Sequence, residues 1–336
     1  MSNNNFNIFK FLKIDRKETI SSQFIVSVLN AKDEANKDNL FLKLLLKRLN
    51  CPDTINISHC SVVAENGLSS KVEKDKEYGR ADIWIRYNNG QVTTTIIIEN
   101  KIDAVDQYKQ LNNYRKYLNE RGPGKLFYLN LHGKPAIPSS TKGDNSVEIK
   151  SGNADTGYEI ITYSNHIIEW LEEVRGSSTN EHLKLFIKQY IYALKPMIEV
   201  YSLLKHKNIL QIDSRFREEG CFLLELNFWM SLQEEIQKCS SSIIDARRRY
   251  SLQKITQKNR IKRAYGIISG NIRIQIDLQN KGLIIGKGSF DEENNWGWTE
   301  KETLAEDVKS LKSLSEAREL ANQVFKQFVK FKSGNK

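Results

Sequence analysis

The sequence is poor in cysteine and histidine. Its four cysteines, among 336 residues, include no CxxC pair, so neither a zinc knuckle nor a disulfide framework is indicated. The five histidines show no HxH or HxxxH spacing, which argues against a histidine metal site. No GxxxxGK[ST] run is present, so the sequence carries no phosphate-binding loop for ATP hydrolysis.

Long apolar runs are also absent. None approaches the roughly 20 residues that a membrane helix needs. The first residues do not have the basic and then apolar layout of a secretory signal peptide. Together with the unpaired cysteines, these absences predict a soluble protein of the reducing cytoplasm with no membrane partner.

Positive charge is in excess, and it is clustered. The net charge is +10, and residues 238–263 hold nine basic residues against one acid. Such a cluster can neutralise phosphates and bind nucleic acid. A solvated connector between domains explains it equally well. The candidate nucleic-acid-binding side chains are Arg247, Arg248, Arg249, Lys254, Lys258, Arg260, Lys262 and Arg263.

Hydrophobic periodicity and turn signals predict an α/β (α+β) fold with a central mixed sheet flanked by helices. Residues 1–198 form the first domain. Its expected helices are 15–30, 39–49, 104–118, 164–174 and 180–195. Its expected strands are 55–65, the two strands of the hairpin 81–101, 125–131 and 158–163, and residues 133–157 are expected to form a loop. Residues 199–336 form a second domain, a helical segment followed by a small α+β module. Its expected elements are helices 199–212 and 216–238, strands within 267–285, an aromatic and acidic loop at 290–298, and a helix at 314–331.

The hairpin 81–101 carries the most informative residues. Asn89-Gly90 is the dipeptide that best fits a two-residue type I′ turn. With that turn, facing residues sum to 179, so Asp82 faces Ile97 and has Glu99 as a diagonal neighbour on the same face. Period-2 alternation places Lys101 on this face as well. Two carboxylates and an ammonium therefore converge at one end of the sheet.

Packing alone does not explain this convergence. Ile96-Ile97-Ile98 predicts a strand with little solvent around it, and Ile83 and Ile85 point to the opposite face with Ile96 and Ile98. A buried carboxylate pair is costly unless a cation compensates it. A hard divalent cation such as Mg²⁺, bound with substrate phosphate, would do so. The alternative is a surface hairpin whose charges face water.

Asp82, sixteen intervening residues and then Glu99-Asn100-Lys101 resemble the signature of the PD-(D/E)xK nuclease superfamily, in its restriction-endonuclease-like bacterial branch. Gln110-x-x-x-Tyr114 is similar to the glutamine–tyrosine motif of RecB-type nucleases. Ala81 stands where many members have proline. The resemblance covers roughly residues 15 to 175, and it implies a restriction-endonuclease-like core.

The resemblance implies a role for each residue of the motif. Asp82, Glu99 and the backbone carbonyl of Asn100 would bind Mg²⁺, or Mn²⁺ in its place, while strand alternation turns the Asn100 side chain to the other face. Lys101 would position the attacking water or help to deprotonate it, and would counter charge in the transition state. Without a metal, Lys101 would instead be an ion-pair partner of Glu99.

Six further residues are candidates for supporting roles. Gln107, Gln110 and Tyr114 would form a stripe on the helix after the hairpin, facing the metal site or the substrate, or else Tyr114 simply packs with leucines. Glu18 and Glu65 could be additional ligands, or Glu18 an exposed acid near a helix amino terminus. Arg80 would contact phosphate or pair with Glu99 across the hairpin.

Together with the resemblance, these observations predict a Mg²⁺-dependent deoxyribonuclease, an endonuclease with double-stranded DNA as its partner. A bacterial defence or restriction-like role is implied by the resemblance alone. Two alternatives stay open: a non-catalytic nucleic-acid-binding module on a nuclease fold, and a nuclease that acts on RNA or branched DNA. Because a single-site nuclease cuts both strands most simply as a two-fold dimer, we also expect a homodimer.

Overall fold

Two units make up the chain, Met1–Glu199 and Val200–Lys336, and each is described by itself. The computed structural model describes residues 7–51, 57, 59–72, 77–102, 106–143, 148–214, 217–238 and 311–333, together with the strands between residues 256 and 304.

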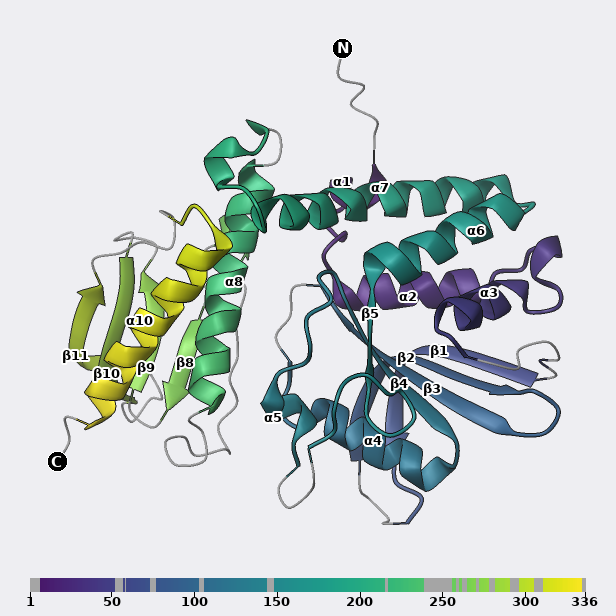
Figure 1. The fold of residues 1–336 in the computed structure, drawn as a ribbon, viewed down its shortest axis with the longest axis horizontal. Helices are drawn as coiled ribbons and strands as arrows, with labels where there is room; N and C mark the ends of the chain where they lie inside the picture. The colour runs from purple at the N-terminus through teal and green to yellow at the C-terminus, as the bar shows by residue number, and fades with distance from the viewer. Residues whose placement is uncertain are drawn as a thin grey trace. The chain divides into compact units, whose positions relative to one another are not determined.

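The first unit is built on a five-stranded mixed sheet (Figure 1). The strand order is β1-β2-β3-β4-β5, with antiparallel β1–β2 and β2–β3 pairs and parallel β3–β4 and β4–β5 pairs. The strands are β1 (His59–Ser69), β2 (Glu77–Asn88), β3 (Thr93–Lys101), β4 (Gly124–Asn130) and β5 (Glu159–Thr162). The predicted mixed sheet is confirmed.

Helices cover both faces of this sheet (Figure 1). One face packs against α2, α3, α6 and α7, and the other against α4. The helices of this unit are α1 (Ile8–Phe11), α2 (Glu18–Leu29), the 3₁₀ turn η1 (Glu34–Asn36), α3 (Leu40–Arg48), α4 (Gln110–Arg121), α5 (Pro138–Thr141), the π-helical turn η2 (Tyr163–Ile168), α6 (Glu169–Ser177) and α7 (Glu181–Leu204).

Strand β3 lies at the centre of the sheet, and its sequence suits that position. Ile96, Ile97 and Ile98 are fully buried, because both faces of the strand are covered. Their β-branched side chains favour the extended backbone. As predicted, Ile96 and Ile98 share the larger hydrophobic cluster with residues of β2, while Ile97 belongs to the cluster on the α4 side.

Helix α4 and strand β4 fit closely together. Leu111, Tyr114 and Leu118 recur at helical spacing and are buried against the sheet. Gly124 begins β4 at a point where a Cβ atom would lie 2.7 Å from the Leu118 side chain, so only glycine fits there without a shift. This packing fixes α4 over the face that carries Ile97.

The predicted register of the β2–β3 hairpin is wrong by two residues. Asn88 pairs with Thr93 and Ile83 with Ile98, so facing residues sum to 181. The connection is a four-residue loop, 89–92, in which the Asn89 side chain accepts hydrogen bonds from the backbone N–H groups of Gln91 and Val92. Asp82 is thereby brought into register with Glu99 instead of Ile97.

Several predicted element boundaries also change. The helix expected over 104–118 begins at Gln110, because Lys109 adopts a left-handed backbone with φ 58°, and residues 104–105 lie outside the described residues. The helix expected from Ser164 instead starts as the turn η2, capped by the Thr162 side chain. The helix expected over 199–212 does not form separately, because α7 continues through Pro196 to Leu204.

The second unit combines helices with a four-stranded antiparallel sheet of order β11-β10-β9-β8. Its elements are η3 (Ile209–Gln211), α8 (Arg217–Lys238), β6 (Thr256–Gln257), β7 (Arg260–Ile261), β8 (Tyr265–Ser269), β9 (Ile272–Asp277), β10 (Gly282–Phe290), β11 (Trp296–Leu304) and α10 (Leu314–Ser333). Trp296 and Trp298 lie in β11, so the predicted loop 290–298 is wrong at its end. Among the described helices of both units, none is long and apolar enough to cross a membrane.

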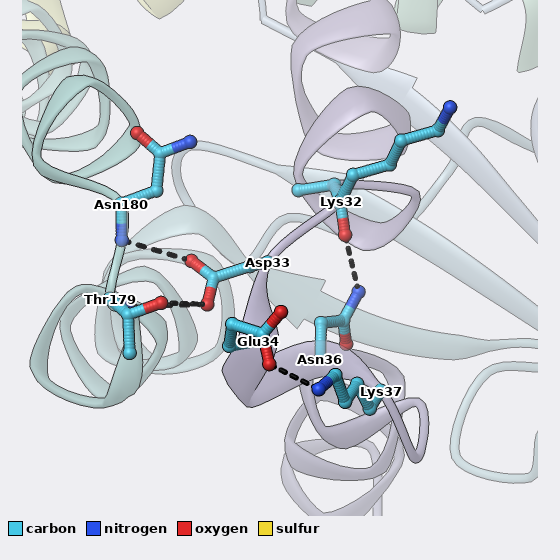
Figure 2. Close-up of a pocket in the computed structure, with 8 residues that line it drawn as sticks. Lys32, Asp33, Glu34, Asn36, Lys37, Thr179 and Asn180 are labelled. Atoms are coloured by element: carbon cyan, nitrogen blue, oxygen red, sulfur yellow. Dashed lines mark hydrogen bonds and ion pairs between the residues drawn. The ribbon is translucent and has the colours of Figure 1, made fainter.

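Asp33 ties two distant segments of the first unit together (Figure 2). Its carboxylate accepts hydrogen bonds from the Ala35 N–H, the Thr179 N–H and hydroxyl, and the Ser178 hydroxyl. Burial opposes ionisation, but these hydrogen bonds outweigh it and hold the pKa of Asp33 well below its usual range. A surface depression of about 590 Å³ lies over this junction, lined by residues 31–34, 36–37 and 179–180, and includes none of the predicted site residues.

We expect Asp33→Asn to destabilise the protein by about 1–3 kcal/mol at pH 7, because it removes charge-assisted hydrogen bonds that join residues 33 and 178–180. Since the folded pKa of Asp33 is depressed, its contribution is complete above the ordinary value of 3.8 and declines as pH falls below it. Urea unfolding from pH 3 to 8 should therefore show that the difference in free energy of unfolding between the wild type and Asp33→Asn narrows below about pH 4.

Glu34→Gln is the matched control. Its ion pair with Lys37 is exposed, so a change under about 1 kcal/mol is expected. An equal effect of both variants would contradict the anchoring role of Asp33.

Candidate active site

Three carboxylates stand in a row across β1, β2 and β3. The pairs Ala64–Ile83 and Asn66–Ala81 bracket Glu65 and Asp82, and the pair Ile83–Ile98 leads directly to Asp82 and Glu99. Because residues in register on neighbouring strands share a face, these acids are close neighbours. The corrected hairpin register thus strengthens the convergence that the sequence predicts.

Asp82 is half-buried and bonded to the adjacent strand. Its Oδ2 accepts a hydrogen bond from the Asn100 N–H at 2.7 Å. Burial raises the pKa of Asp82, against the opposing effects of Lys101 and of this N–H group. The carboxylate is therefore held in a fixed place next to the Glu99-Asn100-Lys101 motif.

Glu99 and Lys101 form a buried ion pair. Glu99 is fully buried and Lys101 is 7% exposed, and Lys101 Nζ contacts Glu99 Oε1. Burial raises the pKa of Glu99 to about 8, even though Lys101 acts in the opposite direction. Burial alone would lower the pKa of Lys101, but Glu99 and the other acids around it raise it, so the ammonium stays protonated.

The structure brings Glu18 to the site. Its Oε1 accepts a hydrogen bond from the Ile102 N–H at 2.7 Å, and its charge acts on both Lys101 and Glu99. Glu18 is the first residue of α2, which packs across this end of the sheet. The alternative of an exposed acid that only favours the helix amino terminus does not describe these contacts.

Arg80 pairs with Glu65 and not with Glu99, so the predicted Arg80–Glu99 pair is wrong. The Arg80 Nε and Glu65 Oε2 atoms lie 2.8 Å apart, and the Arg80 side chain is 67% exposed. The cause is the hairpin register, which does not place Arg80 opposite Glu99. Glu65 has a left-handed backbone with φ 55°, and burial and Asp82 raise its pKa.

Tyr114 joins α4 to the strand that carries Asp82. Its hydroxyl donates to the Arg80 carbonyl at 2.6 Å, and Gln110 Nε2 donates to that hydroxyl at 3.1 Å. Burial, followed by the charges of Glu99 and Asp82, raises the pKa of Tyr114. Tyr114 also packs with the leucines of α4, as in the packing alternative, while its role toward metal or substrate stays a prediction.

Gln107 is not part of the α4 stripe. It precedes the helix and is exposed, and its N–H meets the Gln110 side chain at 3.5 Å. The predicted stripe of three residues on one helix face is therefore wrong at Gln107, because the helix begins three residues later.

The sequence interpretation missed Asp106. This carboxylate accepts hydrogen bonds from the Tyr128 hydroxyl at 2.7 Å and the Ile137 N–H at 2.9 Å, and its charge acts on Lys101. Tyr128 is in register with Glu99 on the neighbouring strand β4. The only signal in the sequence is that Asp106 is an acid four residues before Gln110-x-x-x-Tyr114. Because the sequence predicts a helix over 104–118, Asp106 is interpreted there as an ordinary helical residue.

The donor set suits a hard divalent cation. Asp82, Glu99 and the Asn100 carbonyl offer oxygen ligands. Both carboxylate oxygens of Glu99 are buried and have no regular hydrogen-bond donor among the described residues, apart from the ion pair with Lys101. Within the same described ranges, no three side chains of His, Cys, Asp or Glu are already gathered as a metal site. A cation held here would therefore rely on two carboxylates, backbone oxygen and further ligands from solvent or substrate.

Most of the predicted nucleic-acid-binding cluster lies outside the described residues. This applies to Arg247, Arg248, Arg249, Lys254, Lys258, Lys262 and Arg263. Arg260 begins strand β7, where only the backbone is described. The role of the cluster stays a prediction.

We expect Lys101→Met to destabilise the metal-free protein by up to about 3–5 kcal/mol near pH 9, where Glu99, with a pKa of about 8, is ionised in the wild type and loses its buried cation in the variant. The double variant Lys101→Met/Glu99→Gln should recover most of that loss, since neither charge is then buried. Urea unfolding in EDTA measures both values.

Lys125→Met is the matched control for this comparison. Lys125 pairs with Asp155 at 2.7 Å, but the Asp155 side chain is 61% exposed, so we expect a loss below about 1 kcal/mol. If Glu99→Gln failed to rescue Lys101→Met, the unpaired carboxylate would not be the source of the instability.

Comparison with known proteins gives one match. A family profile described as the PD-(D/E)XK nuclease superfamily matches residues 6–192, which include β1 to β5 and every residue gathered at the site above. No match was found among curated proteins or among solved structures. The matched segment is more than half of the chain, and the chain belongs to the PD-(D/E)XK nuclease superfamily.

Proposed function

We propose that this protein is a divalent-metal-dependent nuclease that hydrolyses phosphodiester bonds of DNA, with Asp82, Glu99 and Lys101 as its catalytic residues. The observation that carries the proposal is a surplus of carboxyl groups around one ammonium: Glu99 is fully buried, and Glu18, Asp82 and Asp106 are half-buried. Four carboxylates, those of Glu18, Asp82, Glu99 and Asp106, act on the single ammonium of Lys101. Such a surplus favours binding of a cation that brings more charge than one lysine can supply.

Each residue of the motif has a role under this proposal. Asp82, Glu99 and the Asn100 carbonyl would hold the metal ion. When bound, the ion supplies Lewis acidity toward the scissile phosphate and lowers the pKa of a bound water. Lys101 stays protonated, so it serves to orient the water or the phosphate and to stabilise negative charge in the transition state.

Because the acids around Lys101 raise its pKa in the metal-free protein, the proposal gives it a positioning and electrostatic role. The predicted alternative, in which Lys101 only pairs with Glu99, describes the metal-free state. Once a cation is bound to Glu99, the ammonium is free to turn toward substrate. Its contact with Glu99 in the described structure is thus compatible with catalysis.

The finer parts of the proposal rest on chemistry and on the family. We propose Mg²⁺ as the metal, with Mn²⁺ able to replace it, because carboxylate and carbonyl oxygens suit both ions. From the sequence and the resemblance we further propose that the substrate is double-stranded DNA and that a homodimer cleaves it endonucleolytically. We also propose a cytoplasmic location and a defence or restriction role. RNA and branched DNA remain alternative substrates for the same site.

Asp82→Asn and Glu99→Gln should each abolish cleavage while the protein stays folded. Both substitutions remove a charged ligand but keep the shape of the side chain, and Glu99→Gln also relieves the cost of a buried charge. The assay incubates plasmid, linear duplex, single strands, branched DNA and RNA with Mg²⁺, Mn²⁺ or EDTA. Lys125→Met, opposite Ile96 and three residues before the register position of Glu99, serves as an active control.

Full activity in either folded variant would remove this hairpin from the active site. Binding of nucleic acid without any cleavage by the wild-type protein would favour the non-catalytic module instead. If the protein cleaved only RNA, the proposed catalytic residues would stand, and RNA would replace DNA as the proposed substrate.

Charge reversal of Arg247, Arg248 and Arg249 tests the basic cluster. If these side chains contact phosphates, affinity for any duplex should fall, and the slope of log K against log salt should shrink by up to about 0.9 per lost contact. Cleavage at saturating DNA should persist, because the catalytic residues lie in residues 82–101. An unchanged salt slope would identify residues 238–263 as a solvated connector.

A further inference from the structure

The side chain of Asn100 lies on the far face of β3 from the carboxylates. Alternation along the strand separates it from its neighbours Glu99 and Lys101. It is fully buried, and it faces α2 and the turn η2. The side chain therefore cannot touch a metal ion or a substrate on the catalytic face.

Every hydrogen-bonding atom of this buried amide is used. Its Nδ2 donates to the Ser22 hydroxyl at 3.0 Å and to the Glu18 carbonyl at 3.2 Å. Its Oδ1 accepts from the Tyr163 hydroxyl at 2.7 Å. Ser22 and Tyr163 are themselves fully buried, so these bonds are shielded from competing water.

The backbone around Asn100 is held from the catalytic side as well. The Asn100 N–H donates to Asp82 Oδ2, and the Ile102 N–H donates to the Glu18 carboxylate. Residues 100–102 are thus fixed by β2, by α2 and by η2 at once. These residues include the Asn100 carbonyl that would bind the metal and also Lys101, and Glu99 immediately precedes them.

Packing alone does not require an amide at this position. A leucine has the same number of side-chain heavy atoms and the same branching, and it carries no polar groups that must be paired, whereas a buried amide left partly unpaired is costly. Hydrogen bonds are directional, whereas apolar contacts are not. The three hydrogen bonds of the amide therefore fix the rotation of the end of β3 about its own axis. That rotation decides where the Glu99 carboxylate, the Asn100 carbonyl and the Lys101 ammonium point.

We propose that Asn100, held by Tyr163 and Ser22, is a positioning residue for the metal-binding end of β3. The proposal rests on the proposed function, in which Glu99 and the Asn100 carbonyl are metal ligands. It assigns to the Asn100 side chain, and to the turn η2 that presents Tyr163, a role in metal affinity and turnover that is exerted entirely through the strand.

Tyr163→Phe and Asn100→Leu test this proposal. The first removes one hydroxyl, and the second replaces the amide with an apolar group of similar size. Both should weaken Mn²⁺ binding about 10-fold or more, measured by calorimetry without nucleic acid, and lower kcat by a similar factor with KM for DNA unchanged. Hydrogen exchange of peptides spanning residues 96–102 should also become faster in both variants.

Trp170→Phe is the matched control. Trp170 is fully buried in the same hydrophobic cluster as Tyr163, and its indole N–H donates to the Phe41 carbonyl at 2.8 Å, away from β3. It also loses one buried aromatic donor, and it should lower the thermal midpoint at least as much as Tyr163→Phe. Its Mn²⁺ affinity, kcat and exchange at residues 96–102 should stay at wild-type values.

The outcomes separate this inference from the proposed function. If Tyr163→Phe and Asn100→Leu lower the thermal midpoint but leave Mn²⁺ affinity at the value of Trp170→Phe, the amide is only a structural group and the proposal is overturned. If the wild-type protein cleaves no nucleic acid while Mn²⁺ affinity falls in both variants, the positioning role stands and the proposed function fails.

Discussion

The burial of the Glu99 carboxylate at the end of the central strand is the constraint on which this site depends. Transfer of an ionised group from water into a protein interior is strongly unfavourable without a partner. Lys101 supplies one positive charge, yet Glu18, Asp82 and Asp106 also act on it. The pKa of Glu99 remains raised to about 8 by burial, in spite of that lysine. The fold therefore holds a charge arrangement that a divalent cation would balance better than the protein does alone.

The sequence predicts the centre of this arrangement because the chemistry is local. Ile96-Ile97-Ile98 indicates a strand with both faces covered, and alternation alone then places Glu99 and Lys101 on one face. Asp82 follows from the hairpin, since only one connection of a few residues separates the two strands. The family match, confined to residues 6–192, agrees with the part of the chain on which this reasoning operates.

The register of the hairpin was not predictable from Asn89-Gly90 alone. A type I′ turn needs positive φ at both central residues, whereas here Gly90 has φ 93° and Asn89 is not among the residues with positive φ. Asn88 and Asn89 use their side chains to accept hydrogen bonds from the Gly90, Gln91 and Val92 N–H groups, which stabilises a longer loop. The choice between a two-residue type I′ turn and this four-residue loop depends on the rotamers of the Asn88 and Asn89 side chains. The preference of the Asn-Gly dipeptide for type I′ turns does not determine that choice.

Residues that reach the site from distant segments were harder to predict for another reason. Glu18 is a single acid in the first turn of α2, where acids are common because they favour helix amino termini, and Asp106 is a single acid in the segment before α4. Only the packing of α2 and of the segment before α4 against the sheet gives them contacts with Ile102, Tyr128 and Ile137. Tertiary structure thus brings single acids from distant segments into one hydrogen-bonded network.

The two faces at the end of β3 differ in a way that links stability to function. On the face that carries Glu99, its oxygens have no regular hydrogen-bond donor within the described part of the chain. On the other face, the Asn100 amide has a partner for each polar atom. Burial of the apolar clusters on both sides of the sheet offsets the free-energy cost of burying the Glu99 carboxyl group. Full pairing of Asn100 keeps the strand end from relaxing in a way that would relieve that cost. An unbalanced carboxylate can be kept in place only if the backbone that carries it is held elsewhere, and this strand is held from its opposite face.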